Sequence, residues 1–550
     1  MRWVRPLSAD LGEGADTVGA KAHGLVALHR LGLPVPPGFV VTTAACRRFR
    51  EVGRLPDGLR GELAAAVRGL EAATGRRFGG TRAPLAVSVR SGAGVSMPGM
   101  MSTVLDLGLT AGAAEALAAE TGDARFALES RLRSLTTFAS ALPGAPADAP
   151  AEGSGDTSGG GDGEGDGGGD TGRLRAAIAA AERRIGRLLG RPFPDDAAGQ
   201  LETAVEAVFS SWDAPRARTY RELNGIPHDL GTAVVVQAMV FGNRDAHSGT
   251  GVAFSRDPGT GENTPSGDVL FARQGDDVVS GREPTLPLSG LGAREPAVAD
   301  ALADALARAE GHFRDACYVE FTFESGGLWL LQVRPGRFTG AAGVRVAVDL
   351  AGAGVITRED ALLRVPPQGL RNVRTPRITA QAQPDVVARG VGACPGVAVG
   401  RLATTSEAAV RMAAEGPVVL VRPETSPDDV RGLAAAAGIA TARGGPAGHA
   451  AVVARSMGKP AAVGIAGLVV DAASATVRAG GRTLAQGDLV AVDGSGGELV
   501  LGDPPTATDT ADAHLGTLLA WADGVTGARP DGDEESRLRA AQTAVRRTRA

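Results

Sequence analysis

The chain has 550 residues, of which 43% are hydrophobic, and its formal net charge at pH 7 is -5. A chain of this length forms roughly three to four domains, and its acidic and basic residues are spread along most of the sequence, so that no basic face favours nucleic acid or an anionic membrane as a partner. Three widely spaced cysteines fit neither a disulfide framework nor a metal cluster. No apolar run reaches the length of a membrane span, and we therefore expect a cytoplasmic protein with buried thiols.

Two N-terminal stretches have features of an anion site. The first, "VGAKAHGLVALHRLGLPVPPGFVVTT", places Lys21 in a turn of small residues before a helix. The second, "LAVSVRSGAGVSMPGMMSTV", predicts an apolar strand that runs through Arg90 into a loop rich in Gly, Ser and Met. Small residues let backbone N–H groups approach a phosphate, and an arginine can hold that phosphate in a fork. Neither stretch has the Walker pattern, and a lone surface charge explains each stretch more simply.

Residues 144–172 interrupt the N-terminal half of the chain. The segment, "GAPADAPAEGSGDTSGGGDGEGDGGGDTG", has seven acidic residues, no basic residue and no apolar side chain larger than proline. Such a segment cannot bury enough apolar surface to offset the entropy that is lost on ordering. We predict a disordered acidic insertion, which expands a loop between two folded segments.

A β-hairpin is predicted in "CYVEFTFESGGLWLLQVRP", residues 317–335. Two alternating runs flank Ser325-Gly326-Gly327, which has the composition of a three-residue hairpin loop. With that loop, the residues that face each other on the polar side are Glu320 with Gln332 and Tyr318 with Arg334. The apolar side consists of Val319, Phe321, Phe323, Trp329, Leu331 and Val333. The polar side suits Mg²⁺ and polyphosphate, but an ordinary hairpin with one solvated face has the same pattern.

The composition and the periodicity of the sequence change near residues 364–388. Here "RVPPQGLRNVRTPRITAQAQPD" is rich in proline and keeps no helical or strand period, so we place a boundary in it. Beyond it, "GPVVLVRPETSPDDVRGLAAAAGIATARGG" predicts a strand, a helix and a strand. Its residues 425–429, Thr-Ser-Pro-Asp-Asp, supply a capping residue, a proline for the first turn and carboxylates near the positive end of the helix. This alternation predicts a compact α/β domain.

His449 lies in "GGPAGHAAVVAR", residues 444–455, where glycines permit a sharp turn before a short helix that ends at Gly458. His449 would then lie at or beside the N-terminus of this helix, where free N–H groups and the helix dipole favour an anion. A phosphoryl group on the imidazole would be stabilised there. A structural histidine in a glycine-rich turn explains this local stretch equally well.

Several stretches, taken together and in chain order, resemble the pyruvate, phosphate dikinase family. They include "GLPVPPGFVVTTAAC", "SVRSGAGVSMPGMMSTVLDLGL", "GTAVVVQAMVFGN", "SGTGVAFSRDPGTGE" and "TARGGPAGHAAVVARSMGKPAAVG". The resemblance runs from about residue 10 to about residue 525 and is interrupted by the acidic insertion. The chain also resembles, more distantly, phosphoenolpyruvate synthase and the rifampicin phosphotransferases.

The resemblance implies an α/β multidomain fold, in which an ATP-grasp-like nucleotide-binding region is followed by a swivelling β/β/α phosphohistidine domain. The domains expected from it are residues 1–340 for the nucleotide-binding region, 341–388 for a helical segment and linker, 389–505 for the mobile phosphohistidine domain, and 506–550 for the lead-in to a TIM barrel. The proline-rich linker would serve as the hinge.

The resemblance also assigns roles to individual residues, with ATP and Mg²⁺ as the implied cofactors. His449 matches the phosphoryl carrier. The residues that match those holding ATP and its metal are Lys21, Arg90, Glu320, Gln332 and Arg334, with Glu320 and Gln332 as metal ligands. Arg133 in "FALESRLRSL" matches a further arginine, and Gln237 and Met239 fall on the strand that lines the adenine site.

Three departures from the family leave several hypotheses open. Tyr318 stands where the family has an aspartate, Ala447 stands where some plant members have a regulatory threonine, and no phosphoenolpyruvate/pyruvate barrel follows in this sequence. The first hypothesis is a phosphotransferase that passes the phosphoryl group from His449 to pyruvate on a separate barrel-bearing subunit, or to another small molecule. The second is a non-catalytic ATP-binding or regulatory protein, and the third is an inactive relic. Because the family barrel usually contributes to dimerisation, the oligomeric state stays open.

Overall fold

The computed structural model divides the chain into two compact units. It describes residues 2–95, 97, 100–144, 167–194, 196–280, 285–336, 338–379, 382–446, 448–508, 512–527 and 533–549. The first unit comprises Met1–Arg244 with Trp329–Gln332, and the second comprises Asp245–Leu328 with Val333–Ala550. The division therefore falls at residue 244, inside the region 1–340 that the sequence analysis treats as one domain. The boundaries expected near residues 340 and 388 both lie within the second unit.

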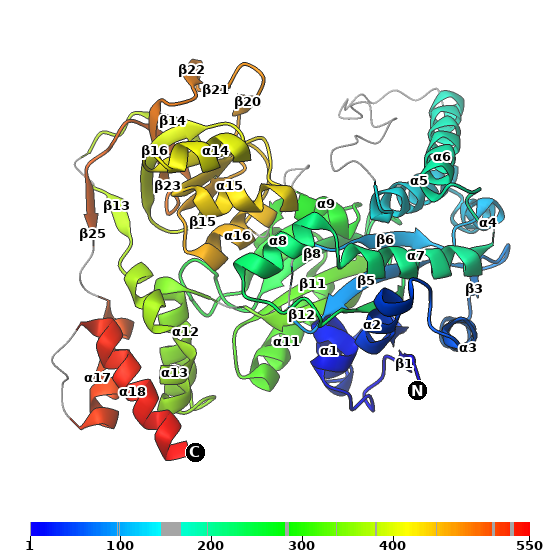
Figure 1. The fold of residues 1–550 in the computed structure, drawn as a ribbon, viewed down its shortest axis with the longest axis horizontal. Coiled ribbons are helices and arrows are strands. Elements are labelled where there is room, and N and C mark those ends of the chain that lie inside the picture. Colours follow the sequence, from blue (N-terminus) through cyan, green and yellow to red (C-terminus); the bar gives the residue numbers. More distant parts are fainter. Residues whose placement is uncertain are drawn as a thin grey trace. The chain divides into compact units, whose positions relative to one another are not determined.

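The first unit is built on a five-stranded antiparallel sheet with the strand order β1-β2-β7-β5-β6 (Figure 1). Its strands are β1 (Val4–Pro6), β2 (Gly38–Val41), β5 (Val87–Ala93), β6 (Thr103–Leu107) and β7 (Thr232–Ala238), and a short parallel pair is formed by β3 (Arg77–Phe78) and β4 (Pro84–Leu85). Its helices are α1 (Ala15–Arg30), α2 (Thr43–Val52), α3 (Leu59–Thr74), α4 (Ala111–Thr121), α5 (Ala124–Ala141), α6 (Gly167–Leu189), α7 (Ala197–Ser211) and α8 (Pro215–Leu223). Apolar side chains of the sheet and of α3, α5 and α7 form its main core.

Lys21 lies inside α1, so the prediction that it precedes a helix is wrong. The helix begins at Ala15 but leaves helical geometry at Gly19, whose φ is 80° and ψ is 154°. A side chain at Gly19 would overlap the carbonyl oxygen of Gly92 in β5. Only glycine allows both this backbone conformation and this close approach, and Lys21 occupies the first turn after the break.

The helix α6 begins within the acidic segment. Residues 145–166 lie outside the described part of the chain, whereas Gly167 already belongs to α6, five residues before the expected end of the insertion. The Asp170 carboxylate lies 3.1 Å from Nη1 of Arg125 in α5 and is in the first turn of α6, where the helix dipole favours a negative charge. The buried Ile178 and Ile185 anchor the helix in the main core.

The second unit contains a five-stranded sheet with the order β10-β9-β8-β11-β12. Its strands are β8 (Gly249–Phe254), β9 (Ser266–Phe271), β10 (Leu286–Pro287), β11 (Cys317–Glu324) and β12 (Gly327–Pro335), and the nearby helices are α9 (Gly275–Ser280), the 3-10 turn η1 (Leu288–Gly290), α10 (Leu291–Arg294) and α11 (Pro296–Phe313). Gly249 and Gly251 lie opposite Phe323 and Phe321, and a side chain at either glycine would meet the facing ring. The small residues of β8 therefore make room for the aromatic rings of β11.

The hairpin between β11 and β12 has a two-residue turn, which corrects the predicted three-residue loop. Ser325 and Gly326 have φ values of 50° and 77°, and positive φ at both positions is the geometry of a type I′ turn. The turn advances β12 by one residue. As a consequence Leu328 and Leu330 are buried, whereas Trp329 and Leu331, which were predicted on the apolar face, are only half-buried.

A helical cluster follows in the second unit. It contains α12 (Gly340–Gly352), α13 (Arg358–Arg364), the 3-10 segment η2 (Pro367–Asn372), α17 (Ala513–Thr526) and α18 (Glu534–Arg549). Figure 1 shows the two C-terminal helices beside α12 and α13, and the four helices share one apolar core. Segments distant in sequence therefore stabilise each other here.

The remainder of the second unit is an α/β domain, as predicted. Its eight-stranded sheet has the order β14-β24-β23-β16-β17-β18-β19-β15. The strands are β14 (Val386–Arg389), β15 (Val391–Cys394), β16 (Val397–Ala403), β17 (Val418–Arg422), β18 (Gly438–Thr441), β19 (Ala461–Val463), β23 (Leu489–Asp493) and β24 (Glu498–Leu501); α14 (Ser406–Ala413), η3 (Pro427–Asp429), α15 (Val430–Ala435) and α16 (His449–Met457) accompany them. A small sheet of β20 (Val469–Asp471), β21 (Thr476–Ala479) and β22 (Arg482–Ala485) and the pair β13 (Pro376–Ile378) with β25 (Thr506–Thr508) complete the unit.

The predicted capped helix is present in this domain. Ser426 is the N-cap of η3, and its side chain forms a capping box with Asp429 that leads into α15.

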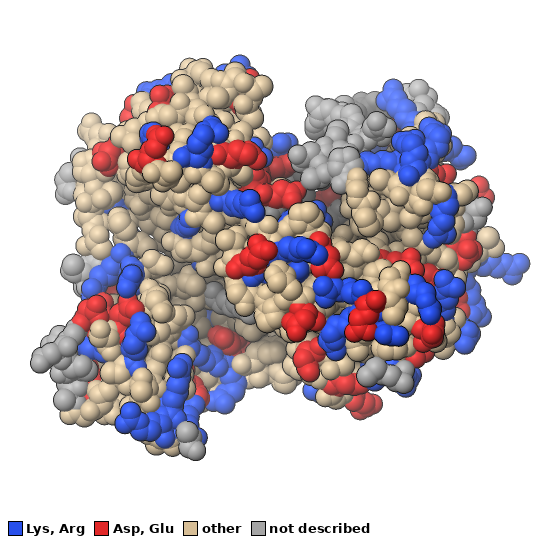
Figure 2. Space-filling model, viewed as in Figure 1, with Lys and Arg blue, Asp and Glu red and all other residues tan. Residues whose placement is uncertain are grey.

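On the face seen in Figure 2, positive and negative side chains are interspersed over each unit. Among the described residues, every helix is too short or too polar to cross a membrane. The cysteines Cys46, Cys317 and Cys394 are free thiols and buried, as predicted.

Candidate active site

His449 is the first residue of α16, as predicted from its glycine-rich approach. Gly448 is the N-cap, and Gly458 ends the helix in the left-handed conformation with a φ of 63°. The N-cap offers no side-chain hydrogen bond, so the first N–H groups of the helix stay available to an anion. Ala447, the position discussed for regulation, lies outside the described residues.

The two ring nitrogens of His449 have different surroundings. Nδ1 lies 3.1 Å from Oγ1 of Thr425, whereas Nε2 is buried and has no hydrogen-bond partner among the described residues. Burial lowers the pKa of His449 to about 4, although the nearby Asp429 acts in the opposite direction. The imidazole is therefore neutral at pH 7, and Nε2 is its one nitrogen without a hydrogen bond.

Asp429 is fixed by the loop that faces His449. Its carboxylate accepts hydrogen bonds from the Ser406 hydroxyl at 2.5 Å and from the Ser426 backbone N–H at 2.8 Å. It also lies 3.4 Å from Nε of Arg422. These contacts hold the carboxylate of Asp429 in place near His449.

Arg90 and Gln237 meet in the first unit. Arg90 lies in β5 and Gln237 in β7, and both are at least nine-tenths buried. Nη2 of Arg90 donates to Oε1 of Gln237 at 2.6 Å and to the carbonyl of Leu331, next to Gln332, at 2.7 Å. Residues two apart on a strand share a face, so Arg90 points to the same side as Gly92, which packs against the stem of Lys21.

The other predicted residues of the first unit are more scattered. Arg133 lies on α5, and Met239 follows β7, where its backbone N–H donates to the carbonyl of Ala86 at 2.9 Å. The Met239 side chain packs against a small apolar cluster that includes Leu117 and Phe126. Gln332 belongs to this unit, whereas Glu320, Arg334 and His449 belong to the second.

The side chains of Tyr318 and Arg334 are in contact, although the two-residue turn removes the direct cross-strand pairing that the sequence predicts for them. The guanidinium carbon of Arg334 is 4.1 Å from the centre of the Tyr318 ring, and Tyr318 meets Phe254 edge-on with ring centres 5.1 Å apart. Burial raises the pKa of the Tyr318 hydroxyl, with Glu320 acting in the same direction. Tyr318 therefore packs as a neutral aromatic residue beside the carboxylate of Glu320.

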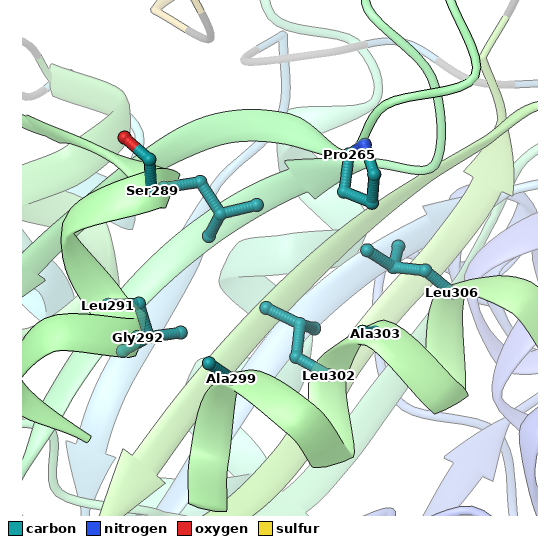
Figure 3. A pocket seen from close by; sticks show the side chains of 9 residues that line it. Pro265, Ser289, Leu291, Gly292, Ala299, Leu302, Ala303 and Leu306 are labelled. Carbon is teal, nitrogen blue, oxygen red and sulfur yellow. The ribbon is translucent and has the colours of Figure 1, made fainter. Parts of the chain in front are cut away.

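The second unit contains two hollows of different chemistry. A cavity of about 950 Å³ is lined by Asp257, Asp268, Thr285, Gly445, Arg345 and Arg455 among others. Figure 3 shows a smaller one of about 230 Å³, whose side chains include Leu291, Leu302 and Leu306 and none that is charged. Only the larger cavity adjoins the loop that precedes His449.

Two residues near His449 have roles that the sequence analysis did not assign. The sequence predicts Thr425 only as part of a helix cap, and it predicts no role for Arg455. Thr425 is separated from His449 by 24 positions, and Arg455 reaches residues of a different sheet. No local pattern signals such long-range contacts.

Comparison with known proteins matches two parts of the chain to families. Residues 53–285 match the pyruvate phosphate dikinase AMP/ATP-binding domain, and residues 414–497 match the mobile domain of PEP-utilising enzymes. The second match contains His449 and Thr425, and the first contains Arg90, Arg133 and Gln237.

Similar proteins align with nearly the whole chain. It is 41% identical over 540 residues to the pyruvate, phosphate dikinase of Rhizobium meliloti, 40% over 514 residues to pyruvate, phosphate dikinase 2 of Zea mays and 39% over 512 residues to the pyruvate, phosphate dikinase of Giardia intestinalis. These alignments cover 92–95% of this chain and 58–60% of the relatives. The chain thus spans about 60% of the length of the relatives that it matches. With its mixed α/β fold, its ATP-grasp-like nucleotide-binding region and its mobile phosphohistidine domain, the chain belongs to the pyruvate, phosphate dikinase family.

Proposed function

We propose that the chain is an ATP-dependent phosphotransferase of the dikinase type, in which Nε2 of His449 accepts a phosphoryl group from ATP and passes it to a second substrate. The observation that carries the proposal is the asymmetric setting of the imidazole, with Nδ1 next to Thr425 and Nε2 unpartnered. Pyruvate, or another small molecule, would be the acceptor, bound either by a separate barrel-bearing subunit or elsewhere on the complete protein.

Thr425 supports this chemistry by holding the imidazole in one orientation, with a hydrogen-bond partner at Nδ1. Nε2 is nucleophilic only when the ring proton is on Nδ1, and in that tautomer Nδ1 donates to Oγ1 of Thr425. The lone pair of Nε2 then forms the bond to phosphorus while the bond from phosphorus to the leaving oxygen of the nucleotide breaks. No proton has to leave Nε2 in this step, and the low pKa of His449 keeps the ring neutral.

Glu320 and Gln332 carry oxygen atoms of the kind that Mg²⁺ takes as ligands, but the two-residue turn removes their predicted cross-strand pairing, and they do not form a metal site by themselves. Among the described residues, no group of three His, Cys, Asp or Glu side chains is placed to hold a metal ion. Mg²⁺ bound to nucleotide phosphates usually needs only one or two protein oxygens, and these two side chains would supply them. When bound, Mg²⁺ would neutralise charge on the phosphate oxygens.

Positive side chains would bind the phosphates directly. Arg90 is held rigidly by Gln237 and the Leu331 carbonyl, and its preorganised guanidinium suits a phosphate. Lys21 lies over the same face of β5. Together they would position the polyphosphate and offset its charge during transfer.

The test is phosphorylation of the purified protein with ATP labelled separately in the β and γ positions, with Mg²⁺ and with or without inorganic phosphate. We expect acid-labile, alkali-stable label from the β position, absent in His449→Ala and retained in His247→Ala, a matched change at an exposed histidine. A folded protein that takes up no label at saturating ATP would refute the proposal.

A second candidate function is ATP binding without phosphoryl transfer. It is favoured by Tyr318, which supplies a buried ring where the family has a carboxylate. Saturable binding of ATP, measured by calorimetry, without labelling of His449 would support this alternative.

A further inference from the structure

Within the second unit, the helix that carries His449 and the loop before it lie against Asp268 and Phe254 of the β8–β11 sheet and against Thr339, which precedes α12. On its N-terminal side, a side chain at Gly445 would come within 2.8 Å of Oγ1 of Thr285 and 3.0 Å of the Asp268 carboxylate. At its C-terminal end, the Thr339 hydroxyl donates to the carbonyl of Arg455 at 3.2 Å. The third contact is the side chain of Arg455. The mobile domain is thus seated on the sheet that carries Glu320 (Figure 1).

The guanidinium of Arg455 contacts both the α/β domain and the β8–β11 sheet. Nη1 donates to the carbonyl of Ala393, in the same α/β domain, at 2.9 Å. Its guanidinium carbon lies 5.5 Å from the centre of the Phe254 ring in the sheet. Burial lowers the pKa of Arg455 only to about 10, so the guanidinium stays charged at neutral pH and can interact with the face of the ring.

Phe254 is held in place by Tyr318, which stands where the family has an aspartate. Phe254 and Tyr318 are paired across β8 and β11, and their rings meet edge-on. The guanidinium of Arg334 lies over the Tyr318 ring. Asp257 and Asp268 are the acidic groups that act on Arg455. An aspartate at position 318 would remove one ring from this aromatic seat.

We propose that Arg455 is a positioning residue, which seats the His449 helix on the sheet by stacking on Phe254, and that Tyr318 supports this seat in place of a metal-binding carboxylate. The catalytic consequence, faster transfer from ATP to His449, rests on the proposed function. The docking itself does not.

A disulfide between Gly445→Cys and Thr285→Cys measures docking independently of activity. The built position at Gly445 places the two Cβ atoms no more than about 4 Å apart, within the range of a disulfide. The fraction that is cross-linked at equilibrium in a glutathione redox buffer reports the docked population. The chain's three natural cysteines are buried and stay in place.

In this background, Arg455→Gln and Phe254→Leu should each lower the effective concentration of the thiol pair about five-fold or more, because each removes one partner of the stack. The double variant should lose no more than either single variant if the two residues act through each other. Tyr318→Phe, which keeps the ring, should cross-link like the parent, and so should Arg443→Gln, a matched loss of an exposed arginine.

Thermal unfolding of each variant separates loss of docking from loss of folding. Because Arg455 also binds Ala393, Arg455→Gln can weaken its own domain; Phe254→Leu changes the opposite side of the contact and keeps the test decisive. Cross-linking that stays within two-fold of the parent in a folded Phe254→Leu protein overturns the proposal.

A second readout links docking to transfer. The single-turnover rate of His449 labelling should fall in Arg455→Gln while the dissociation constant of ATP stays unchanged. If the parent protein is not labelled at all, the proposed function fails, and the cross-linking result still decides the role of Arg455.

Discussion

His449 combines two properties that oppose each other in a typical surface histidine. It is buried enough to stay neutral, and it lies at a helix N-terminus that favours a negative charge. Neutrality makes Nε2 a nucleophile, and the helix end stabilises the phosphorylated product. The same burial that suits the chemistry has a cost in stability at low pH.

The first prediction concerns that cost. Because the pKa of His449 is about 4 in the folded protein and about 6.5 in an unfolded chain, the unfolded state binds more protons between these values. The free energy of unfolding therefore falls as pH falls from 6.5 towards 4, and His449 contributes a loss of about 2 kcal/mol between pH 7 and pH 5.

Urea unfolding of the parent and of His449→Gln at pH 7 and pH 5 measures the contribution of His449 to the free energy of unfolding. The contributions of the other histidines cancel in the comparison, so the variant should lose about 2 kcal/mol less than the parent. Equal losses in both proteins would show that His449 titrates normally.

Thr425 gives the second prediction. Thr425→Val keeps the shape of the side chain but removes the hydrogen bond to Nδ1, so the ring loses the contact that holds Nε2 in one orientation. A net hydrogen bond contributes about 1 kcal/mol, and we expect the rate of His449 labelling to fall about five- to ten-fold. Thr425→Ser should restore most of the rate; a serine variant as slow as valine would assign Thr425 a packing role instead.

At the scale of single residues, the sequence predicts the features that depend on neighbours along the chain. The position of His449 at a helix start follows from Gly448 and Gly458. The stack of Arg455 on Phe254 joins residues about 200 positions apart, and nothing in either local sequence encodes the partner. The hydrogen bond of Arg90 to Gln237 likewise depends on the pairing of β5 with β7.

The elements show where turn chemistry overrides a plausible pattern. Ser325-Gly326-Gly327 is compatible with loops of two or three residues, and the choice moves every later side chain of β12 by one position. Burial of Leu328 and Leu330 accompanies the two-residue choice. In α1, the broken helix at Gly19 could not be foreseen, because its cause is the backbone of Gly92, a residue of a different element.

The third prediction tests the contact between α1 and β5. Gly19→Ala adds a side chain where φ is 80° and where the Gly92 carbonyl leaves no room. We expect the first unit to lose at least about 3 kcal/mol of stability. Gly69→Ala, in the interior of α3 with open space around it, should instead gain up to about 1 kcal/mol.

Chemical denaturation followed by tryptophan fluorescence measures both variants. Trp212 is fully buried in the first unit and reports on its unfolding. A tolerated Gly19→Ala would mean that α1 can straighten without losing its contact with the sheet.

On the scale of the whole molecule, each unit has its own apolar core. The main core of the first unit is formed by strands β2, β5, β6 and β7 with α3, α5 and α7, and the second unit has separate clusters in its helices and in its α/β domain. Sequence predicts an α/β multidomain chain and the boundary character of the linker, but it places a single domain over residues 1–340. The division at residue 244 depends on which strands share a sheet, and strand order is a property of the folded chain.

Separate cores lead to the last prediction, which is that the chain unfolds in more than one step. Calorimetry should resolve at least two transitions. Gly19→Ala should lower the transition of the first unit alone. Leu538→Ala, at a fully buried position of α18, removes about 2–5 kcal/mol from the helical cluster of the second unit and should lower only a transition of that unit. If each substitution instead shifted all transitions together, the two units would unfold as one cooperative body.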